Sequence, residues 1–370
     1  MKIGIVCYPT FGGSGVVATE LGKALAQEGH KIHFITYTQP ARFDFFNENL
    51  FYHEVSISSY PLFEYPPYEL ALASKMVNVV KYEKLDLLHV HYAIPHASAA
   101  YMAKQILKTH GIHIPVVTTL HGTDITLVGK DPSYEPVVTF SINQSDGVTA
   151  VSEDLKQDTY KHFAINKEIE VIPNFIDLDR FKKQKKEHFK KAIAPHNEKL
   201  LVHTSNFRKV KRIEDVIRVF SEVRKQIPSK LLLVGDGPER TAMENLSRQL
   251  DACDDVRFLG KLDAVEEVLS VCDLFVMPSE KESFGLAALE AMACEVPVIS
   301  SDAGGIPELN VHGKTGFISK VGDVPDMVKN ALFILKDENL PTFKHNAIER
   351  AKEFDVTRIL PMYENYYKKY

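Results

Sequence analysis

The chain opens with the stretch Lys2-Ile-Gly-Ile-Val-Cys-Tyr8, which is followed by Gly12-Gly-Ser-Gly15 and by a mixed apolar and polar segment that runs to about Glu28. A short, mostly apolar run that ends at a proline, here Pro9, is typical of a buried strand. The glycine-rich segment predicts a tight turn, and the segment after it predicts an amphipathic helix. A buried strand that leads through a short turn into a helix is the first unit of an α/β fold.

The same alternation continues along the rest of the chain. Further apolar runs predict strands at 31–37, 51–57, 86–91, 115–120 and 147–151, and then at 168–172, 199–204, 230–235, 255–259, 273–277 and 296–300. Helical patterns separate these runs, which indicates parallel strands joined by crossover helices on both faces of a sheet. We therefore predict an α/β protein with two Rossmann-like, doubly wound domains that face a cleft, at 1–170 and 171–354. A last helix at about 355–370 is expected to pack back on the first domain.

The composition excludes several classes of protein. The 370 residues are enough for two domains, and the net charge of −5 gives no general attraction to nucleic acid or to anionic membranes. The four cysteines show no CxxC spacing, which favours buried thiols in a reducing compartment. The first apolar run is too short for a signal peptide or a membrane span, so we expect a cytoplasmic protein with no stable membrane association.

Two carboxylates in the second half, Glu282 and Glu290, flank a predicted strand-to-helix turn at Ser283-Phe284-Gly285. A helix that starts near Gly285 offers free backbone N–H groups and a positive dipole end, which suit a phosphate. Carboxylates accept hydrogen bonds from pairs of sugar hydroxyls. The pattern therefore favours a nucleotide sugar, although acidic residues near a helix start are also ordinary capping partners.

Other segments of the second half offer groups for the same ligand. Arg208 and Lys211, in the loop after an expected strand, can converge on one diphosphate, or they can belong to a solvated basic loop. The turn Phe258-Leu-Gly-Lys261 can present backbone polar groups to a base.

The glycine-rich turn of the first half is the next candidate. Gly12-Gly-Ser-Gly15 can bring backbone amides to a phosphate or to an acceptor carboxylate, or it can be a tight turn alone. It matches neither the GxGxxG fingerprint nor a Walker loop.

Histidines cluster in the first half, where His89, His91 and His96 lie on or just after an expected strand. Alternate strand residues share one face, so a metal site has to be considered. No carboxylate or cysteine joins them at ligand spacing, and we therefore favour structural histidines, with Tyr92 as the better candidate for a substrate contact.

A second polar segment, Thr118-Thr-Leu-His-Gly-Thr-Asp124, ends a buried strand. There His121 can hydrogen-bond a ligand and Asp124 can hold the turn. A serine hydrolase is disfavoured because no Gly-x-Ser-x-Gly elbow supplies a nucleophile.

Taken together, these residues resemble the retaining GT-B glycosyltransferases of family 4, over essentially the whole chain. Gly12-Gly13, His121, the Arg208/Lys211 pair and the Glu282-to-Glu290 segment occur in the order that this family has. The resemblance implies that the first domain binds the acceptor and the second the donor. It implies catalytic roles for His121, Arg208, Lys211 and Glu282. It assigns donor binding to Gly13, Asn206, Arg208, Lys211, Gly260, Lys261, Glu282, Ser283, Phe284, Gly285, Leu286 and Glu290.

The resemblance also implies the chemistry. Arg208 and Lys211 would neutralise the departing diphosphate, Glu290 would hold the ribose, and Glu282 the transferred sugar. The family requires no metal and no other cofactor, and it retains anomeric configuration, by departure and attack on one face. Members of the family often have glycine after the lysine, whereas here Arg212 follows Lys211. This difference leaves open which basic residue contacts which phosphate.

A closer likeness, to the branch of the family that transfers N-acetylglucosamine from UDP-GlcNAc to L-malate in bacillithiol biosynthesis, is carried by residues 8–15, 89–96, 120–126 and 206–212. Candidate acceptor residues are Gly13, Ser14, Gly15, Arg42, Tyr92 and Thr119.

Two alternatives stay open. The first is a transferase with a lipid-linked or other sugar acceptor, for which an apolar patch would comprise Phe43, Phe45, Phe46 and Phe51, diluted by Asp44, Glu48 and Glu54. The second is a non-catalytic UDP-sugar-binding protein. A homodimer is compatible with the sequence, which does not determine the oligomeric state.

Overall fold

The computed structural model describes residues 1–43, 46–57 and 64–370. The chain forms two compact units, Met1–Asn174 with Thr357–Tyr370, and Phe175–Val356. Asp44 and Phe45 of the aromatic patch considered above lie outside the described residues.

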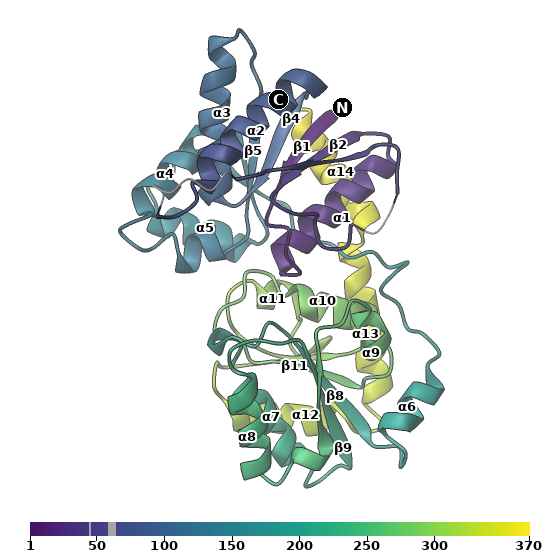
Figure 1. The fold of residues 1–370 in the computed structure, drawn as a ribbon. Helices are drawn as coiled ribbons and strands as arrows, with labels where there is room; N and C mark the ends of the chain where they lie inside the picture. The colour runs from purple at the N-terminus through teal and green to yellow at the C-terminus, as the bar shows by residue number, and fades with distance from the viewer. Residues whose placement is uncertain (44–45, 58–63) are drawn as a thin grey trace. The chain divides into compact units, whose positions relative to one another are not determined.

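The first unit contains a parallel sheet of seven strands (Figure 1). The strands are β1 (Lys2–Val6), β2 (Lys31–Thr36), β3 (Leu50–Glu54), β4 (Leu87–His91), β5 (Val116–Leu120), β6 (Gly147–Ala150) and β7 (Ile169–Val171). Their order is β3-β2-β1-β4-β5-β6-β7. The direction of winding reverses between β1 and β4, and ligands of such sheets bind beyond the carboxyl ends of the strands at this point.

Helices cover both faces of this sheet. They are α1 (Gly13–Gln27), α2 (Tyr68–Glu83), α3 (Ser98–Thr109), α4 (Glu135–Gln144) and α5 (Glu153–His162). Two short turns lie at Ala93–Ala97, where Ile94 is extended (φ −130°, ψ 142°), and at Thr123–Leu127. α2 and α3 bury their apolar side chains with Ile35, Leu88 and Val90 on one face. α1 packs on the other face, where Gly22 closely approaches the ring of Phe34.

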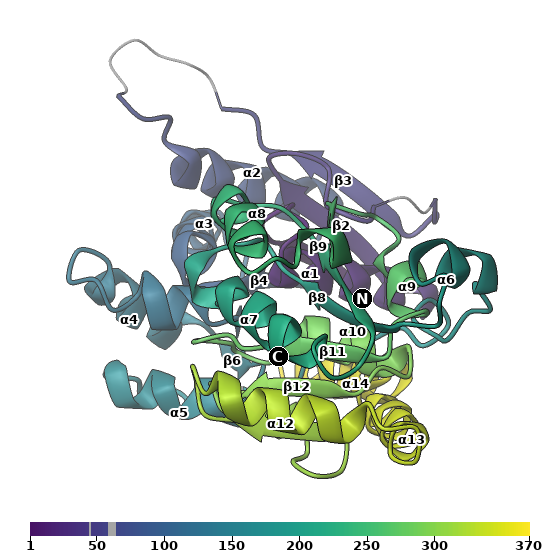
Figure 2. The same ribbon diagram turned by 90° about the horizontal axis from the view of Figure 1, so that it is seen from below.

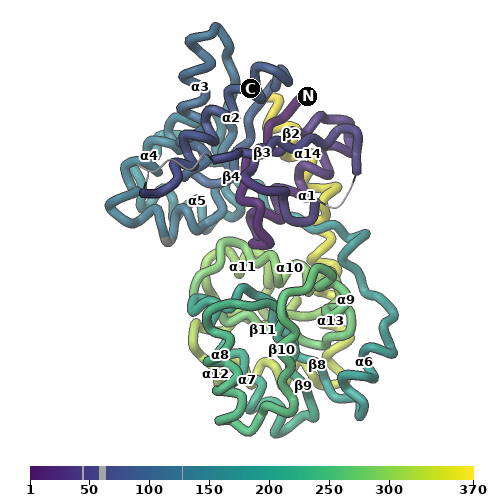
Figure 3. Tube along the Cα trace, in the orientation of Figure 1, coloured from purple at the N-terminus to yellow at the C-terminus, as the bar shows by residue number. Residues whose placement is uncertain are grey.

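The C-terminal helix α14 (Val356–Tyr367) returns to the first unit, as the yellow segment in Figure 3 shows. Tyr366 donates a hydrogen bond to the Val148 carbonyl (3.0 Å), and the Tyr367 hydroxyl lies 2.8 Å from Nδ1 of His89. Tyr363 and Tyr367 are fully buried, so the helix completes the core of this unit.

The second unit has a parallel sheet of six strands, in the order β10-β9-β8-β11-β12-β13. They are β8 (Lys199–Thr204), β9 (Ser229–Val234), β10 (Val256–Gly260), β11 (Leu274–Met277), β12 (Val298–Ser301) and β13 (Gly316–Ser319). β13 was not expected from the sequence, because its four residues form no apolar run. The expected strand at 168–172, assigned above to the start of the second half, is β7, because it pairs with β6 of the first sheet.

The helices of this unit are α6 (Glu187–Ile193), α7 (Ile213–Val223), α8 (Arg240–Gln249), α9 (Val265–Leu269), α10 (Leu286–Ala293), α11 (Ile306–Leu309), α12 (Val324–Ile334) and α13 (Leu340–Ala351). α7 lies beside α8 and α12, and α10 beside α9 and α13 (Figures 1 and 2). Both faces of the sheet are therefore covered. In the described part of the chain, no helix is both long and apolar enough to cross a membrane.

Candidate active site

The loops that follow β8 and β11 flank the point where the second sheet reverses its winding. The Glu280 amide donates to the Val210 carbonyl (2.8 Å), which joins the two loops through the backbone. Lys211 Nζ lies 2.6 Å from Glu282 Oε2, and the two side chains are 22% and 18% exposed. Two candidates that are 71 residues apart in the chain are thus in direct contact.

The loop after β8 is held at its start by His203, which the sequence analysis did not single out. His203 Nδ1 donates to the Val276 carbonyl (2.8 Å), so Nε2 has no hydrogen and accepts from the Ser205 hydroxyl (2.8 Å). Burial lowers the pKa of His203 to about 4, and it is neutral at pH 7. Phe207, fully buried, has a left-handed backbone (φ 40°), and such strain is found where surrounding structure imposes it.

The remaining polar groups of this edge lie at the surface. Arg208 and Asn206 are exposed, and Arg208 has no side-chain partner among the residues that the structure describes. An exposed guanidinium of this kind, three residues before Lys211, is available to a ligand anion. Gly260 accepts a hydrogen bond from the Gly235 amide (2.7 Å), and Lys261 after it is exposed.

The helix that follows β11 starts one residue after Gly285, which adopts φ 97° and ψ 47°. A side chain there would be strained by this φ and would approach Met277 Cε to 3.2 Å. Phe284 is buried and packs edge-to-face on Phe354, which anchors the turn, while Ser283 and Leu286 are half-buried. Glu290 lies inside α10 and is 8% exposed. The start of α10 therefore presents backbone amides beside Glu282.

In the first unit, the loops after β1 and β4 are in contact, as the loops after β8 and β11 are in the second unit. Ser14 Oγ lies 2.8 Å from the Tyr92 hydroxyl. Gly13, Ser14 and Gly15 are the first residues of α1, whose N-cap Gly12 has no side chain to bond their amides. Free amides and two hydroxyls thus converge at a helix N-terminus, which suits an anion.

Tyr92 has an unusual backbone, with φ 86°. A positive φ at a bulky residue is a strained conformation that the neighbouring structure must hold in place. Its ring packs on those of Tyr8 (5.4 Å between centroids) and His121 (5.4 Å). Burial and the nearby Asp124 raise the pKa of Tyr92 to about 12, so its hydroxyl is a neutral donor at pH 7.

His121 is 9% exposed at the end of β5, and its Nε2 lies 2.7 Å from His91 Nδ1. His91 Nε2 is buried and has no partner within the described chain. A buried unpaired N–H is costlier than an unpaired lone pair, so we assign the shared hydrogen to His91. This leaves His121 an Nδ1–H donor. Burial lowers the pKa of His121 to about 3, so it is neutral.

Asp124 holds the turn that carries His121. Its carboxylate accepts from the Gly122 amide (3.0 Å) and from the Ala93 amide (2.9 Å), so it ties the loops after β4 and β5 together. Burial raises the pKa of Asp124 to about 6, although the amide bonds oppose this shift.

The two remaining acceptor candidates differ in their surroundings. Thr119 is fully buried, and its hydroxyl is 2.7 Å from both His89 Nε2 and Thr149 Oγ1. It therefore supports the site from below its surface. Arg42 is half-buried with a left-handed backbone (φ 63°), and its carbonyl accepts from Lys23 (3.4 Å).

One cluster of metal-ligand type is present among the described residues, at the outer edge of the first sheet. His33, His53 and Glu83 offer ligand atoms within 4.8 Å of one another. His33 Nδ1 is 2.9 Å from His53 Nε2, but the second nitrogen of His33 is buried without the partner that a metal-bound imidazole normally has. The amine of Lys2 donates a hydrogen bond to the Glu83 carbonyl (2.8 Å), and its positive charge disfavours a cation nearby. We therefore describe this cluster as a stacked histidine pair.

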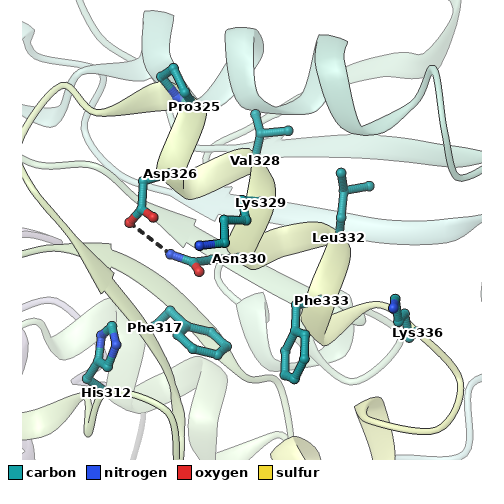
Figure 4. Close-up of a pocket in the computed structure, with 10 residues that line it drawn as sticks. All are labelled: His312, Phe317, Pro325, Asp326, Val328, Lys329, Asn330, Leu332, Phe333 and Lys336. Carbon is teal, nitrogen blue, oxygen red and sulfur yellow. Dashed lines mark hydrogen bonds between the residues drawn. The ribbon is translucent and has the colours of Figure 1, made fainter.

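A surface depression of about 720 Å³ lies on α12 of the second unit, lined by His312, Phe317, Pro325, Asp326, Val328, Lys329, Asn330, Leu332, Phe333 and Lys336. Figure 4 shows Phe317 and Phe333 on one side of the helix and Val328 on the other. None of the site candidates lines it.

Comparison with known proteins identifies the family of this chain. The family models for Glycosyltransferase Family 4 and for Glycosyl transferases group 1 match residues 11–180 and 184–354. The chain belongs to the family 4 glycosyltransferases, which have the two-domain GT-B fold.

Among individual relatives, the chain is 50% identical to N-acetyl-alpha-D-glucosaminyl L-malate synthase of Bacillus anthracis, over 99% of this chain and 96% of that protein. It is 27% identical to alpha-monoglucosyldiacylglycerol synthase of Streptococcus pneumoniae, over 84% and 72% of the two chains. HepE of Anabaena, solved in complex with UDP and glucose, has a TM-score of 0.85 and 20% identity over 100% of both chains, which shows the shared fold.

Proposed function

We propose that this glycosyltransferase moves N-acetylglucosamine from UDP-GlcNAc to the hydroxyl of L-malate with retention, the first step of bacillithiol biosynthesis. The observation that carries the donor part is the Lys211–Glu282 contact, which joins a basic loop to the acidic start of α10. The acceptor part rests on the 50% identity to the malate enzyme of Bacillus anthracis.

The second unit binds the donor. Arg208 and Lys211 neutralise the diphosphate, and the first amides of α10 add the positive end of a helix dipole. Glu290 accepts hydrogen bonds from the ribose hydroxyls, and Glu282 from hydroxyls of the transferred sugar. The backbone at Gly260 and Lys261 contacts the uracil.

The first unit binds the acceptor. Malate carries two carboxylates, and the amides at Gly13–Gly15 with the hydroxyls of Ser14 and Tyr92 form a donor-rich seat for one of them. Arg42 is our candidate for the other carboxylate. The neutral His121 donates to the sugar near its reacting carbon.

Transfer breaks the bond from the anomeric carbon to the phosphate oxygen and forms a bond to the malate hydroxyl on the same face. The hydroxyl proton passes to the departing phosphate, and Arg208 and Lys211 stabilise the charge that develops there. No metal or other cofactor takes part in this scheme.

The direct test is incubation with UDP-GlcNAc and a panel of acceptors, including L-malate, D-malate, succinate and dispersed diacylglycerol. We expect UDP release and a product of malate glycoside mass only with L-malate, α configuration by proton coupling, and undiminished turnover in EDTA. Turnover with another acceptor would redirect the assignment, and binding of UDP without any turnover would favour a sensor protein.

The lipid alternative receives little support from the aromatic patch. Phe43 packs edge-to-face on Phe34, and Phe51 stacks on His33 at 4.6 Å, so both are engaged within the unit. Phe46 is exposed. Co-sedimentation with anionic vesicles tests this alternative directly, because strong binding would favour a membrane acceptor.

A further inference from the structure

Arg212 occupies the position where many family members have glycine, and its backbone is left-handed, with φ 49° and ψ 50°. Glycine adopts this conformation without strain, whereas an arginine is held in it by the surrounding structure. The residue lies between the 3-10 turn Lys209–Lys211 and the first residue of α7.

The guanidinium of Arg212 binds one carboxylate in helix α7 and one in the loop after β11, and it lies close to a third segment. Nε donates to Asp215 Oδ2 (2.6 Å) at the start of α7, and Nη1 donates to Glu280 Oε1 (2.8 Å) in the loop after β11. Its third nitrogen lies over Gly322, where an added Cβ would come within 3.3 Å. Gly322 belongs to the loop between β13 and α12.

The three basic side chains of this loop differ in their partners. Arg208 is exposed and free of side-chain partners in the described structure, and Lys211 is paired with Glu282. Two of the five N–H donors of Arg212 are held by the carboxylates of Asp215 and Glu280, whose negative charges offset its own. It therefore attracts a phosphate less strongly than Arg208 does. Its pKa is raised by the hydrogen bond to Asp215, and it is a permanent cation.

We propose that Arg212 is a positioning residue, a proposal that rests on the donor site described above. Its side chain links the loop after β8 to the loop after β11, and we call this link the strap. The strap sets the distance between the phosphate-binding and the sugar-binding groups. Glu280 is its anchor on the far loop, two residues before Glu282. The hydrogen bond from the Glu280 amide to the Val210 carbonyl is a second link between the same two loops.

The sharpest variant is Glu280→Gln, because it weakens the link between the loops and leaves the Arg212–Asp215 pair intact. Glu280 is 44% exposed, so the change leaves no buried charge uncompensated. We expect the UDP dissociation constant and the donor KM to rise by roughly two- to fivefold, the size expected for one partly exposed ion pair. The KM for the acceptor and the melting temperature stay close to wild type.

Two further variants separate positioning from folding. Arg212→Gly fits the left-handed backbone but removes the whole strap, so donor binding falls further, and Arg212→Lys restores part of it. Arg218→Gln on the exposed side of α7 and Glu222→Gln are matched controls that leave donor binding unchanged.

Hydrogen exchange gives a readout that does not depend on any ligand. In Glu280→Gln, peptides covering 205–212 and 278–285 exchange faster than in wild type, and peptides of β9 do not. Unchanged exchange together with unchanged UDP binding would overturn the strap. Failure of the wild-type protein to bind UDP would instead overturn the donor site, while faster loop exchange would still support the strap.

Discussion

Among single residues, Arg208 has an exposed side chain and lies three residues before Lys211, which is paired with Glu282. A cation of this kind contributes most when negative charge develops on a leaving group. Its contribution should therefore appear in the rate of the chemical step.

We expect Arg208→Ala to lower kcat by about 10²–10³, the usual loss for one group that stabilises developing charge. Steady-state kinetics with saturating donor and acceptor measure this change. Lys209→Ala, which removes a neighbouring exposed cation from the same loop, is the matched control and should retain near-normal kcat. Equal losses in the two variants would mean that only the net charge of the loop matters.

Glu290 is 8% exposed within α10, and in the donor site proposed above its carboxylate accepts hydrogen bonds from the two ribose hydroxyls. Glu290→Gln keeps the shape of the side chain but removes its charge. We expect the donor KM and the UDP dissociation constant to rise by roughly tenfold, with kcat changing little. An unchanged donor KM would remove the ribose role from this residue.

At the scale of elements, the start of α1 packs closely against the backbone of the loop that precedes it. A Cβ on Gly15 would lie 2.4 Å from the carbonyl oxygens of Tyr8 and Thr10, so only glycine allows this packing. A Cβ on Gly12 would meet nothing closer than Thr10 Oγ1 at 3.4 Å, and Gly12 has φ −73°. The two glycines therefore differ in what they require.

We expect Gly15→Ala to reduce the free energy of unfolding by about 1–3 kcal/mol, as overpacking commonly does, and to raise the acceptor KM because the amides at the start of α1 shift. Gly12→Ala is the control and should change the free energy of unfolding little, because the lower entropy of the unfolded chain is offset by the poorer N-cap that alanine makes. Urea titration and acceptor kinetics on both variants provide the test. Similar effects in both would show that the loop after β1 tolerates a shift of α1.

The whole molecule carries buried histidines whose protonation opposes folding. Burial lowers the pKa of His89 and His121 to about 3 and of His96 to about 4, whereas histidines of an unfolded chain titrate near about 6.5. Between about pH 6.5 and 4 the unfolded chain thus binds more protons, and the free energy of unfolding falls as the pH falls. Asp124, with its raised pKa, acts in the opposite direction between about pH 4 and 6, but it is one group against several.

We therefore expect stability to be level above about pH 7 and to drop on acidification, by up to about 1.4 kcal/mol per pH unit for each such histidine. His96→Asn, in which an amide N–H can replace the Nδ1 donor to the His91 carbonyl, should flatten this dependence. His345→Asn, at an exposed position, should not. Calorimetry from pH 5 to 8 distinguishes the three proteins, and parallel curves would contradict the assignment of His96.

Local sequence patterns determined much of this protein. Apolar runs, turn glycines and helical periodicity are short-range features, and they were sufficient to predict the two parallel α/β sheets and the loops after β1, β4, β5, β8 and β11. They failed for β13, which is too short to form an apolar run, and for the sheet to which β7 belongs, which depends on its pairing with β6.

Only the tertiary structure decided how the candidate residues divide their tasks. It showed that Thr119 is buried against His89, that Phe51 stacks on His33, and that Arg212 is held by Asp215 and Glu280. Each of these outcomes depends on residues brought together by folding, such as Arg212 and Glu280, which are 68 positions apart. Sequence spacing places a residue on an element, but the free energy of a charge or a hydroxyl depends on the neighbours that packing supplies.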